Sequence, residues 1–146
     1  MPAAPEIRRA LACPEIAAAI EIRRAVFVLE QGGPAADEPD ARDGNARHYL
    51  VLAGGRPVGA ARLLDAGGGE FRIGRVCLLK EARGRGWGEA LMHYLIAEAR
   101  LLGARELILD AQLGALPFYE RLGFAPEGEV FPDAGIPHRR MRRRLE

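Results

Sequence analysis

Three glycines at alternate positions, Gly84, Gly86 and Gly88, stand directly before a long amphipathic segment in "RGRGWGEALMHYLIAEARLL". Glycine loses more conformational entropy on folding than any other residue, so this placement needs a physical reason. The first turn of a helix has unpaired backbone N–H groups and a partial positive charge. Without Cβ atoms, such a backbone can approach a phosphate closely. The stretch therefore predicts a phosphate-binding turn, to which Arg83 and Arg85 add positive charge and bidentate donors.

Two common kinds of phosphate site do not match this turn. A P-loop requires Gly-Lys-Ser/Thr, and the chain contains no such triplet. A dinucleotide fingerprint requires G-x-G-x-x-G, but Glu89 stands where the third glycine belongs. The strands before the turn also read as antiparallel, whereas a Rossmann site needs a βαβ unit. The remaining match is Arg/Gln-x-x-Gly-x-Gly/Ala, which residues 83–88 satisfy between a strand and a helix.

The rest of the sequence predicts one mixed α/β (α+β) domain that spans residues 1–146. The expected elements are strands at 5–11, 48–53, 56–64, 70–79, 104–112, 124–131 and 138–146, and helices at 14–28, after the glycines and around 117–122. Gly54 and Gly55 predict a hairpin turn. Residues 30–47 are rich in Gly, Pro and Asp and predict a long loop, which in a compact domain is usually functional or mobile.

The helix after the glycines carries an apolar stripe that predicts its buried face. Leu91, Tyr94, Leu95 and Leu102 are expected to lie on that face, with Glu98 near its edge. Gly103 is expected to end the helix.

Composition excludes several classes of protein. The net charge of +1 gives no general attraction to nucleic acid or to a membrane surface. Cys13 and Cys77 are the only cysteines and lie far apart, which argues against a disulfide framework. Charged residues come too early for a secretory signal, and no apolar run reaches the ~20 residues that cross a bilayer. We therefore expect a cytoplasmic protein, and no metal-ligand spacing occurs in the sequence.

Four segments together resemble one protein family. Residues 83–88 resemble the acyl-CoA-binding motif of the GNAT superfamily of N-acetyltransferases, and "ALPFYERLGF" resembles its second signature, a tyrosine shortly before Leu-Gly-Phe. "RRAVFVLEQGGP" and "AGIPHRRMRR" resemble the ElaA-like and YjcF-like branch, and the likeness extends over essentially the whole chain. It implies the GNAT fold, a mixed, mostly antiparallel sheet of six or seven strands flanked by helices, whose fourth and fifth strands splay apart.

The resemblance also implies an activity and its partners. The chain would use acetyl-CoA as cosubstrate, without a metal, and would acetylate a primary amine of a small-molecule or peptide acceptor by direct attack in a ternary complex. A homodimer is compatible with the resemblance.

The family motifs imply which residues would hold the coenzyme. Backbone groups of Val76, Cys77 and Leu78 would contact the pantetheine arm, and one N–H would polarise the thioester carbonyl. Gln112 stands where many relatives carry an asparagine that binds the cofactor, so its side chain is a longer version of the same amide. The residues that would hold the pyrophosphate are Arg83, Gly84, Arg85, Gly86, Trp87, Gly88 and Glu89.

Three residues are candidates for proton transfer. Tyr119 matches the signature tyrosine, whose phenol would protonate the leaving thiolate. The substrate ammonium, with a pKa near 10, must lose a proton before it attacks, and Glu30 and His138 are the candidate bases. Cys77 could instead form an acyl-cysteine, but no motif supplies the His/Asp pair that would activate it, and a thiol in a central strand usually packs in the core.

Two charged segments each allow more than one interpretation. The acidic run of Asp37, Glu38, Asp40 and Asp43 would favour a cationic acceptor if its loop borders the acceptor site, and otherwise forms a solvated surface loop. The arginine-rich end, residues 139–144, could bind nucleic acid, protect an edge strand by charge, or meet the 3′-phosphate of CoA.

Other functions share parts of this pattern. A non-catalytic acyl-CoA-binding regulatory module would keep the glycine turn and would not need Tyr119. An acyl-homoserine-lactone synthase shares the fold and a loosely similar "RRAVF" region, but no residue pattern here demands its second substrate, S-adenosylmethionine. The acetyltransferase interpretation accounts for more of the chain than either alternative.

Overall fold

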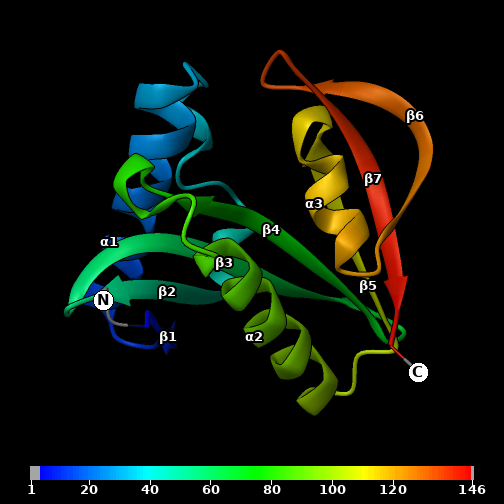
Figure 1. Ribbon diagram of the computed structural model, residues 1–146, viewed down its shortest axis with the longest axis horizontal. Helices are drawn as coiled ribbons and strands as arrows, with labels where there is room; N and C mark the ends of the chain where they lie inside the picture. The colour runs from blue at the N-terminus through cyan, green and yellow to red at the C-terminus, as the bar shows by residue number, and fades with distance from the viewer. Residues whose placement is uncertain (1–3, 146) are drawn as a thin grey trace.

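A seven-stranded mixed sheet runs through the molecule in the order β1-β2-β3-β4-β5-β7-β6 (Figure 1). The computed structural model describes residues 4–145, so residues 1–3 and 146 of the predicted domain lie outside the described part. The strands are β1 (Glu6–Ala10), β2 (Arg47–Ala53), β3 (Arg56–Gly67), β4 (Glu70–Leu78), β5 (Glu106–Gln112), β6 (Ala125–Asp133) and β7 (Ile136–Arg144). Neighbouring strands are antiparallel except β4 and β5, which confirms the predicted fold class.

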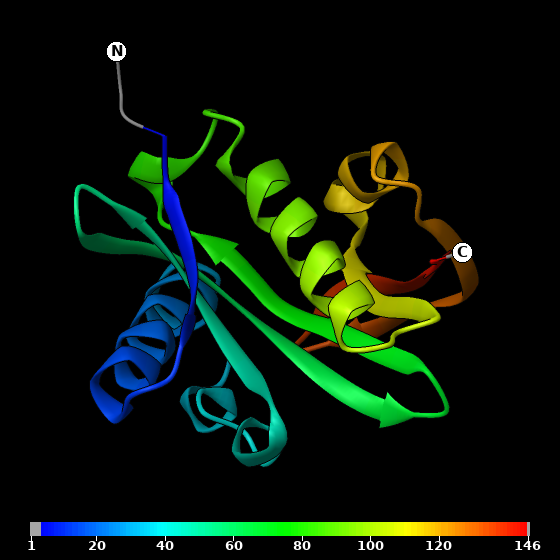
Figure 2. The ribbon, with the colours of Figure 1, turned by 90° about the horizontal axis from the view of Figure 1, so that it is seen from below.

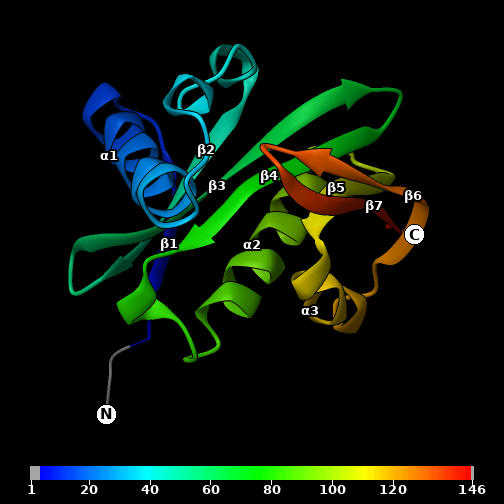
Figure 3. The ribbon, with the colours of Figure 1, turned by 90° about the horizontal axis from the view of Figure 1, so that it is seen from above.

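Helices cover both faces of this sheet. Helix α1 (Cys13–Arg23) lies on one face, and α2 (Trp87–Leu101) and α3 (Leu116–Arg121) lie on the other (Figure 2 and Figure 3). Because side chains alternate along a strand, β2 serves both layers: Tyr49 and Val51 pack with α2, whereas Leu50 and Leu52 pack with α1. The apolar run in β2 therefore reflects burial on both faces.

The predicted first helix is longer and less regular than its sequence pattern suggests. Helix α1 ends at Arg23 and continues directly as a π-helical segment, η1 (Arg24–Glu30). The following loop contains two short 3-10 turns, η2 (Ala35–Asp37) and η3 (Asp43–Asn45). None of the described helices is long and apolar enough to cross a membrane.

The buried stripe of α2 differs from the prediction. Leu91 and Leu95 are buried as expected, but Leu102 lies just beyond the last helical residue and is 37% exposed. Gly103 has a φ of +88° and turns the chain away from the helix, as predicted. The remaining buried positions of the helix are Met92, Ile96 and Ala99.

Strands β4 and β5 are paired only where they begin. Residues 70–72 of β4 pair with residues 106–108 of β5, and no further pairs follow between them (Figure 1). Beyond that point β5 pairs only with β7. The strand β4 also contains an irregularity, because its register with β3 shifts between Gly74 and Cys77, and Arg75 there has a φ of +53°. The splay implied by the family resemblance is therefore present.

The arginine-rich end does not form an edge strand. Strand β7 lies between β5 and β6, so the proposal that charge protects an exposed edge there is wrong. Arg142 instead contacts the carboxylates of Glu127, Glu70 and Glu106 at 2.6–3.1 Å. Arg140 pairs with Asp110 at 3.0 Å. These ion pairs join β7 to its neighbours β5 and β6 and also to β4.

Candidate active site

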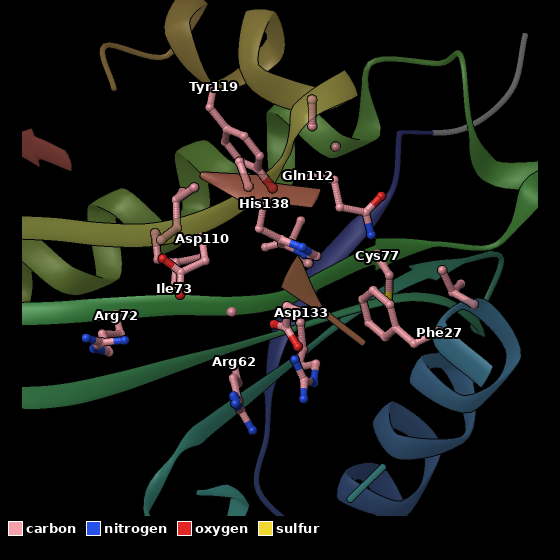
Figure 4. Close-up of a pocket in the computed structure, with 18 of the residues that line it drawn as sticks. Phe27, Arg62, Arg72, Ile73, Cys77, Asp110, Gln112, Tyr119, Asp133 and His138 are labelled. Atoms are coloured by element: carbon pink, nitrogen blue, oxygen red, sulfur yellow. The ribbon is translucent and has the colours of Figure 1, made fainter. Parts of the chain in front are cut away.

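A cavity of about 820 Å³ opens where β4 and β5 part. Its walls come from both strands, from α3, from β7 and from η1, which brings together side chains that are far apart in the sequence (Figure 4). Among the predicted site residues, those that line it are Val76, Cys77, Leu78, Arg83, Gly88, Gln112, Tyr119 and His138.

The glycine turn lies at one end of this cavity and leads into α2. Gly84 and Gly86 have φ values of +76° and +80°, which a residue with a Cβ adopts only under strain. Gly86 is the N-cap of α2 and has no side chain to bond the first turn, so backbone N–H groups there are left for another partner. A Cβ at either glycine would meet no protein atom within 4 Å. The open backbone at a helix N-terminus fits a diphosphate.

Gly88 differs from the other two glycines. A Cβ at Gly88 would make ordinary contacts, at 3.6 Å from Phe118 Cζ and 3.7 Å from Leu78 Cδ1. Among the three glycines, the conformational requirement is therefore confined to Gly84 and Gly86.

Arg83 is held in place by Glu30, one of the two predicted bases. Its Nη1 and Nη2 donate to Glu30 Oε2 and Oε1 at 2.7 Å each, and its Nε donates to the Leu78 carbonyl at 3.0 Å. The hydrogen bonds from Arg83 lower the pKa of the Glu30 carboxyl, which makes it a weaker base. Among the described residues Glu30 is also not part of the cavity wall, which weighs against its predicted role.

Arg85 and Trp87 stabilise the outer side of the turn. The Arg85 guanidinium lies 5.3 Å from the centre of the Trp87 ring, and its Nε donates to the Glu81 carbonyl at 3.2 Å. The cation therefore remains near the glycines without an ion-pair partner among the described residues, as expected for a group that binds phosphate.

The edge of β4 that faces the gap is free of strand pairing from Ile73 onward. Its other edge bonds to β3, where Cys77 pairs with Ala60 and Leu78 with Gly59. Backbone groups of residues 76–78 are thus available to an extended ligand, as the resemblance implied. The Cys77 thiol is only 6% exposed, and burial raises its pKa to about 12. A thiol that stays protonated is a poor nucleophile.

Tyr119 projects from α3 into the cavity (Figure 4). Its ring is fixed edge-on by Phe118, with centroids 5.0 Å apart, and by Phe124 at 6.1 Å. Burial raises the pKa of the phenol to about 12, so the hydroxyl remains protonated at neutral pH. This is the state that a general acid requires.

His138 lies opposite Tyr119, on β7 (Figure 4). Its Nδ1 is 2.7 Å from the Ile136 carbonyl oxygen, which can only accept, so the proton is assigned to Nδ1 and Nε2 carries the lone pair. The ring stacks on Phe131, with centroids 6.1 Å apart. His138 is the cross-strand partner of Gln112, whose amide donates to Gln31 Oε1 at 3.0 Å.

Three of the four carboxylates in the acidic run are paired with arginines. Glu38 is 2% exposed, and its Oε1 accepts from Arg23 Nε at 2.7 Å. Arg75 Nε lies 2.9 Å from Glu38 Oε2, without the alignment of a hydrogen bond, so this contact is an ion pair only. Asp43 contacts both Arg23 and Arg62, at 2.8 and 3.0 Å. The interpretation as a solvated surface loop is therefore wrong for these residues, which bury a network of charges.

The comparisons with known proteins agree with this geometry. The family model for the acetyltransferase (GNAT) domain matches residues 16–145. The chain belongs to the GNAT family of N-acetyltransferases. A Bacillus subtilis relative, described as the uncharacterized N-acetyltransferase YjcF, is 40% identical over 126 residues, which cover 84% of this chain and 88% of that protein.

Two solved structures extend the likeness of this GNAT protein to three dimensions. Escherichia coli ElaA superposes with a TM-score of 0.86 at 31% identity, covering 96% of this chain and 99% of ElaA. An acyl-CoA N-acyltransferase from Pseudomonas aeruginosa superposes with a TM-score of 0.85 at 33% identity, covering 96% of this chain and 98% of that one. The GNAT family uses acetyl-CoA, and the splayed strands and open glycine turn of this member fit that group.

Several cavity residues of this GNAT protein were not predicted from the sequence. They are Phe27, Arg42, Arg62, Arg72, Arg75, Asp110 and Asp133, whereas the lining residues Asp37 and Asp40 belong to the acidic run and Arg140 to the arginine-rich end. Strict alternation would place Arg72 and Arg75 on opposite faces of β4, because they are three residues apart. The irregularity at Arg75 shifts the alternation and brings both to the cavity. The left-handed conformation of a non-glycine residue gives no signal in the sequence.

Proposed function

We propose that this chain transfers an acetyl group from acetyl-CoA to a primary amine by direct attack in a ternary complex. The observation that carries the proposal is the placement of Tyr119, a partly buried phenol that stays protonated, in the wall of the cavity where β4 and β5 part. Residues 76–78 and the turn at residues 83–89 would bind the pantetheine and the pyrophosphate. Gln112 would add an amide contact near the acetyl group.

Two protein groups, His138 and Tyr119, would carry the proton transfers of the reaction. His138 Nε2 would accept a proton from the acceptor ammonium, directly or through water, and the neutral amine would attack the thioester carbonyl. As the C–S bond breaks, Tyr119 would donate its proton to the sulfur, and the second proton that the attacking nitrogen loses would pass through water to the tyrosinate, which leaves a neutral amide, a thiol and a neutral phenol. Glu30 would position Arg83 for the pyrophosphate, since its carboxylate is engaged by that guanidinium.

A neutral, buried Cys77 supports direct transfer over an acyl-cysteine intermediate. Initial rates at varied acetyl-CoA and amine concentrations test this, because a ternary complex gives intersecting double-reciprocal lines. Parallel lines and acetylation of Cys77 on incubation with acetyl-CoA alone would contradict it.

The first experiment is a screen of primary amines for CoA release, detected with a thiol reagent. Amine-dependent release supports the proposal. Tight binding of acetyl-CoA without turnover of any amine would favour the non-catalytic acyl-CoA-binding module instead. We also propose a cytoplasmic location, supported by the two free thiols, Cys13 and Cys77, which suit a reducing compartment.

A further inference from the structure

The cavity contains an unusual number of arginines, which are Arg42, Arg62, Arg72, Arg75, Arg83 and Arg140. Four of them have a carboxylate partner within 3.1 Å. Within residues 4–145, Arg42 and Arg72 form no ion pair. Arg42 is exposed to solvent, whereas Arg72 is half-buried. Arg72 therefore differs from every other cation of the cavity wall.

Arg72 lies in an environment that disfavours its charge. Burial is the largest effect that lowers the pKa of this guanidinium, followed by the nearby charges of Arg140 and Arg42. Asp110 and Glu70, whose charges oppose this effect, are already paired with Arg140 and Arg142. A partly dehydrated cation whose acidic neighbours are otherwise engaged attracts an anion from outside the protein.

The sheet register places Arg72 at a defined distance from the proposed chemistry. Arg72 pairs with Ile108 at the closed end of the splayed strands, whereas His138 pairs with Gln112, four residues further along β5. At about 3.3 Å per residue, these levels are about 13 Å apart along the strand. Figure 4 shows Arg72 at one end of the pocket and the Tyr119, His138 and Gln112 group toward the other.

Within the described part of the chain, the cavity carboxylates that form no ion pair lie at the other end. Asp37 and Asp133 line the main cavity, and both also line a smaller adjoining pocket together with His138. The two ends of the acceptor space are thus of opposite character, with unpaired acids near the proposed base and an unpaired guanidinium at the far end.

We propose that the acceptor is an aminocarboxylate, whose amine lies at His138 and whose carboxylate is bound by Arg72. This rests on the proposed function and names the substrate class of the same site. A guanidinium binds a carboxylate through two parallel hydrogen bonds, which a neutral or cationic amine cannot form. A polyamine would instead place its second ammonium beside Arg72.

The test compares acceptors that differ only at the end remote from the amine. The series comprises ω-aminocarboxylates from glycine to 6-aminohexanoate, the n-alkylamines and the diamines of matching length. At least one aminocarboxylate should exceed its matching diamine in kcat/KM by about tenfold or more. A consistent preference for diamines would overturn the proposal.

Variants assign the preference to Arg72. Arg72→Gln should lower kcat/KM for the best aminocarboxylate by about ten- to a hundredfold and leave the alkylamines within about twofold. Arg72→Lys should recover part of the loss, and Arg100→Gln, at an exposed helix position outside the cavity, should change nothing. An equal loss for aminocarboxylates and alkylamines would overturn the proposal.

A binding measurement separates this inference from the proposed function. If no amine is acetylated, the proposed function fails. Whether Arg72 binds a carboxylate is then tested separately, by the NMR resonance of its side-chain Nε–H in the ¹⁵N-labelled protein. That resonance should move on titration with hexanoate and stay in place with hexylammonium. If hexanoate does not shift this resonance, the inference is overturned, whether or not the enzyme is active.

Discussion

The two ends of the cavity use different parts of the chain for recognition. At the coenzyme end, Gly84 and Gly86 expose backbone at the start of α2, and β4 leaves one edge unpaired. At the acceptor end, charged side chains from β4, β5, β7 and the loop after α1 form the wall. The first end would bind a constant ligand through the main chain, and the second would select among acceptors through side chains.

This difference explains why the sequence predicted the coenzyme end of the cavity better than the acceptor end. A backbone site needs particular conformations over a few consecutive residues, and those conformations require glycine. A side-chain site is assembled from residues whose proximity depends on the whole fold. Short motifs therefore point to the coenzyme end and say little about the acceptor.

Removing the phenol should have the largest effect on catalysis. We expect Tyr119→Phe to lower kcat by about 10²–10⁴-fold, the range that general acid catalysis contributes. Affinity for acetyl-CoA, measured by calorimetry, should change little because the ring and its aromatic contacts with Phe118 and Phe124 remain. Retention of full turnover would remove Tyr119 from the mechanism.

Breaking the buried charge network should destabilise the fold and leave the coenzyme-binding backbone in place. Glu38→Gln leaves Arg23, which is 1% exposed, without one of its charge partners. We expect the free energy of unfolding to fall by about 3–5 kcal/mol, measured by urea denaturation. The exposed pair of Arg56 and Glu81 offers the control, because Glu81→Gln should cost at most about 1 kcal/mol. Equal effects would mean that the network contributes no more than a surface pair.

The glycine turn should tolerate substitution at one position and not at another. Gly86→Ala forces a Cβ into the left-handed region, at a cost of about 1–2 kcal/mol, and should weaken CoA binding by about tenfold or more. Gly88→Ala is the matched control, since its Cβ would make only ordinary contacts. Calorimetry with CoA should separate the two variants. If both bind as the parent does, backbone recognition there is wrong.

Acid should weaken the network through Asp43. Burial alone would raise the pKa of this carboxyl, but hydrogen bonds from Arg23, the Asp40 N–H and Arg62 outweigh it and leave the pKa well below its ordinary value of 3.8. A lowered folded-state pKa stabilises the protein above the unfolded-state value, and this stability is lost as the pH falls below about 4. Asp43→Asn should flatten that part of the stability–pH curve. An unchanged slope would contradict the assignment.

Glu30→Gln should have the smallest effect. Because the pair with Arg83 is partly exposed, we expect KM for acetyl-CoA to change severalfold and kcat to stay within about threefold. His138→Gln, in contrast, should lower kcat and alter its pH profile if Nε2 is the base. A collapse of kcat in Glu30→Gln alone would restore Glu30 as the base.

Much of the fold was predictable because its signals are local. The positive φ values at Gly54 and Gly55 confirm the predicted hairpin turn, and that at Gly103 marks the predicted end of α2. Hydrophobic alternation and helical periodicity placed every strand and helix to within a few residues. The π-helical segment was not predicted, since it differs from an α-helix only in its hydrogen bonding.

The acceptor end was not predictable for a physical reason. Arg75 contacts Asp40 across 35 residues of sequence, and Arg62 contacts the same carboxylate across 22. Such pairs depend on how loops fold onto strands. From sequence alone, a charged residue in a loop is expected to be exposed to solvent. The acidic run that suggested a cationic acceptor is largely neutralised by arginines.

The central claim is that main chain at residues 83–89, beside the open edge of β4, holds the diphosphate of acetyl-CoA. Titration of ¹⁵N-labelled protein with CoA, followed by amide NMR, tests it most directly. The account predicts that the largest amide shifts fall at residues 84–89, with a second set at residues 76–78. Saturating CoA that leaves those amides unmoved, or moves only amides elsewhere, would contradict it.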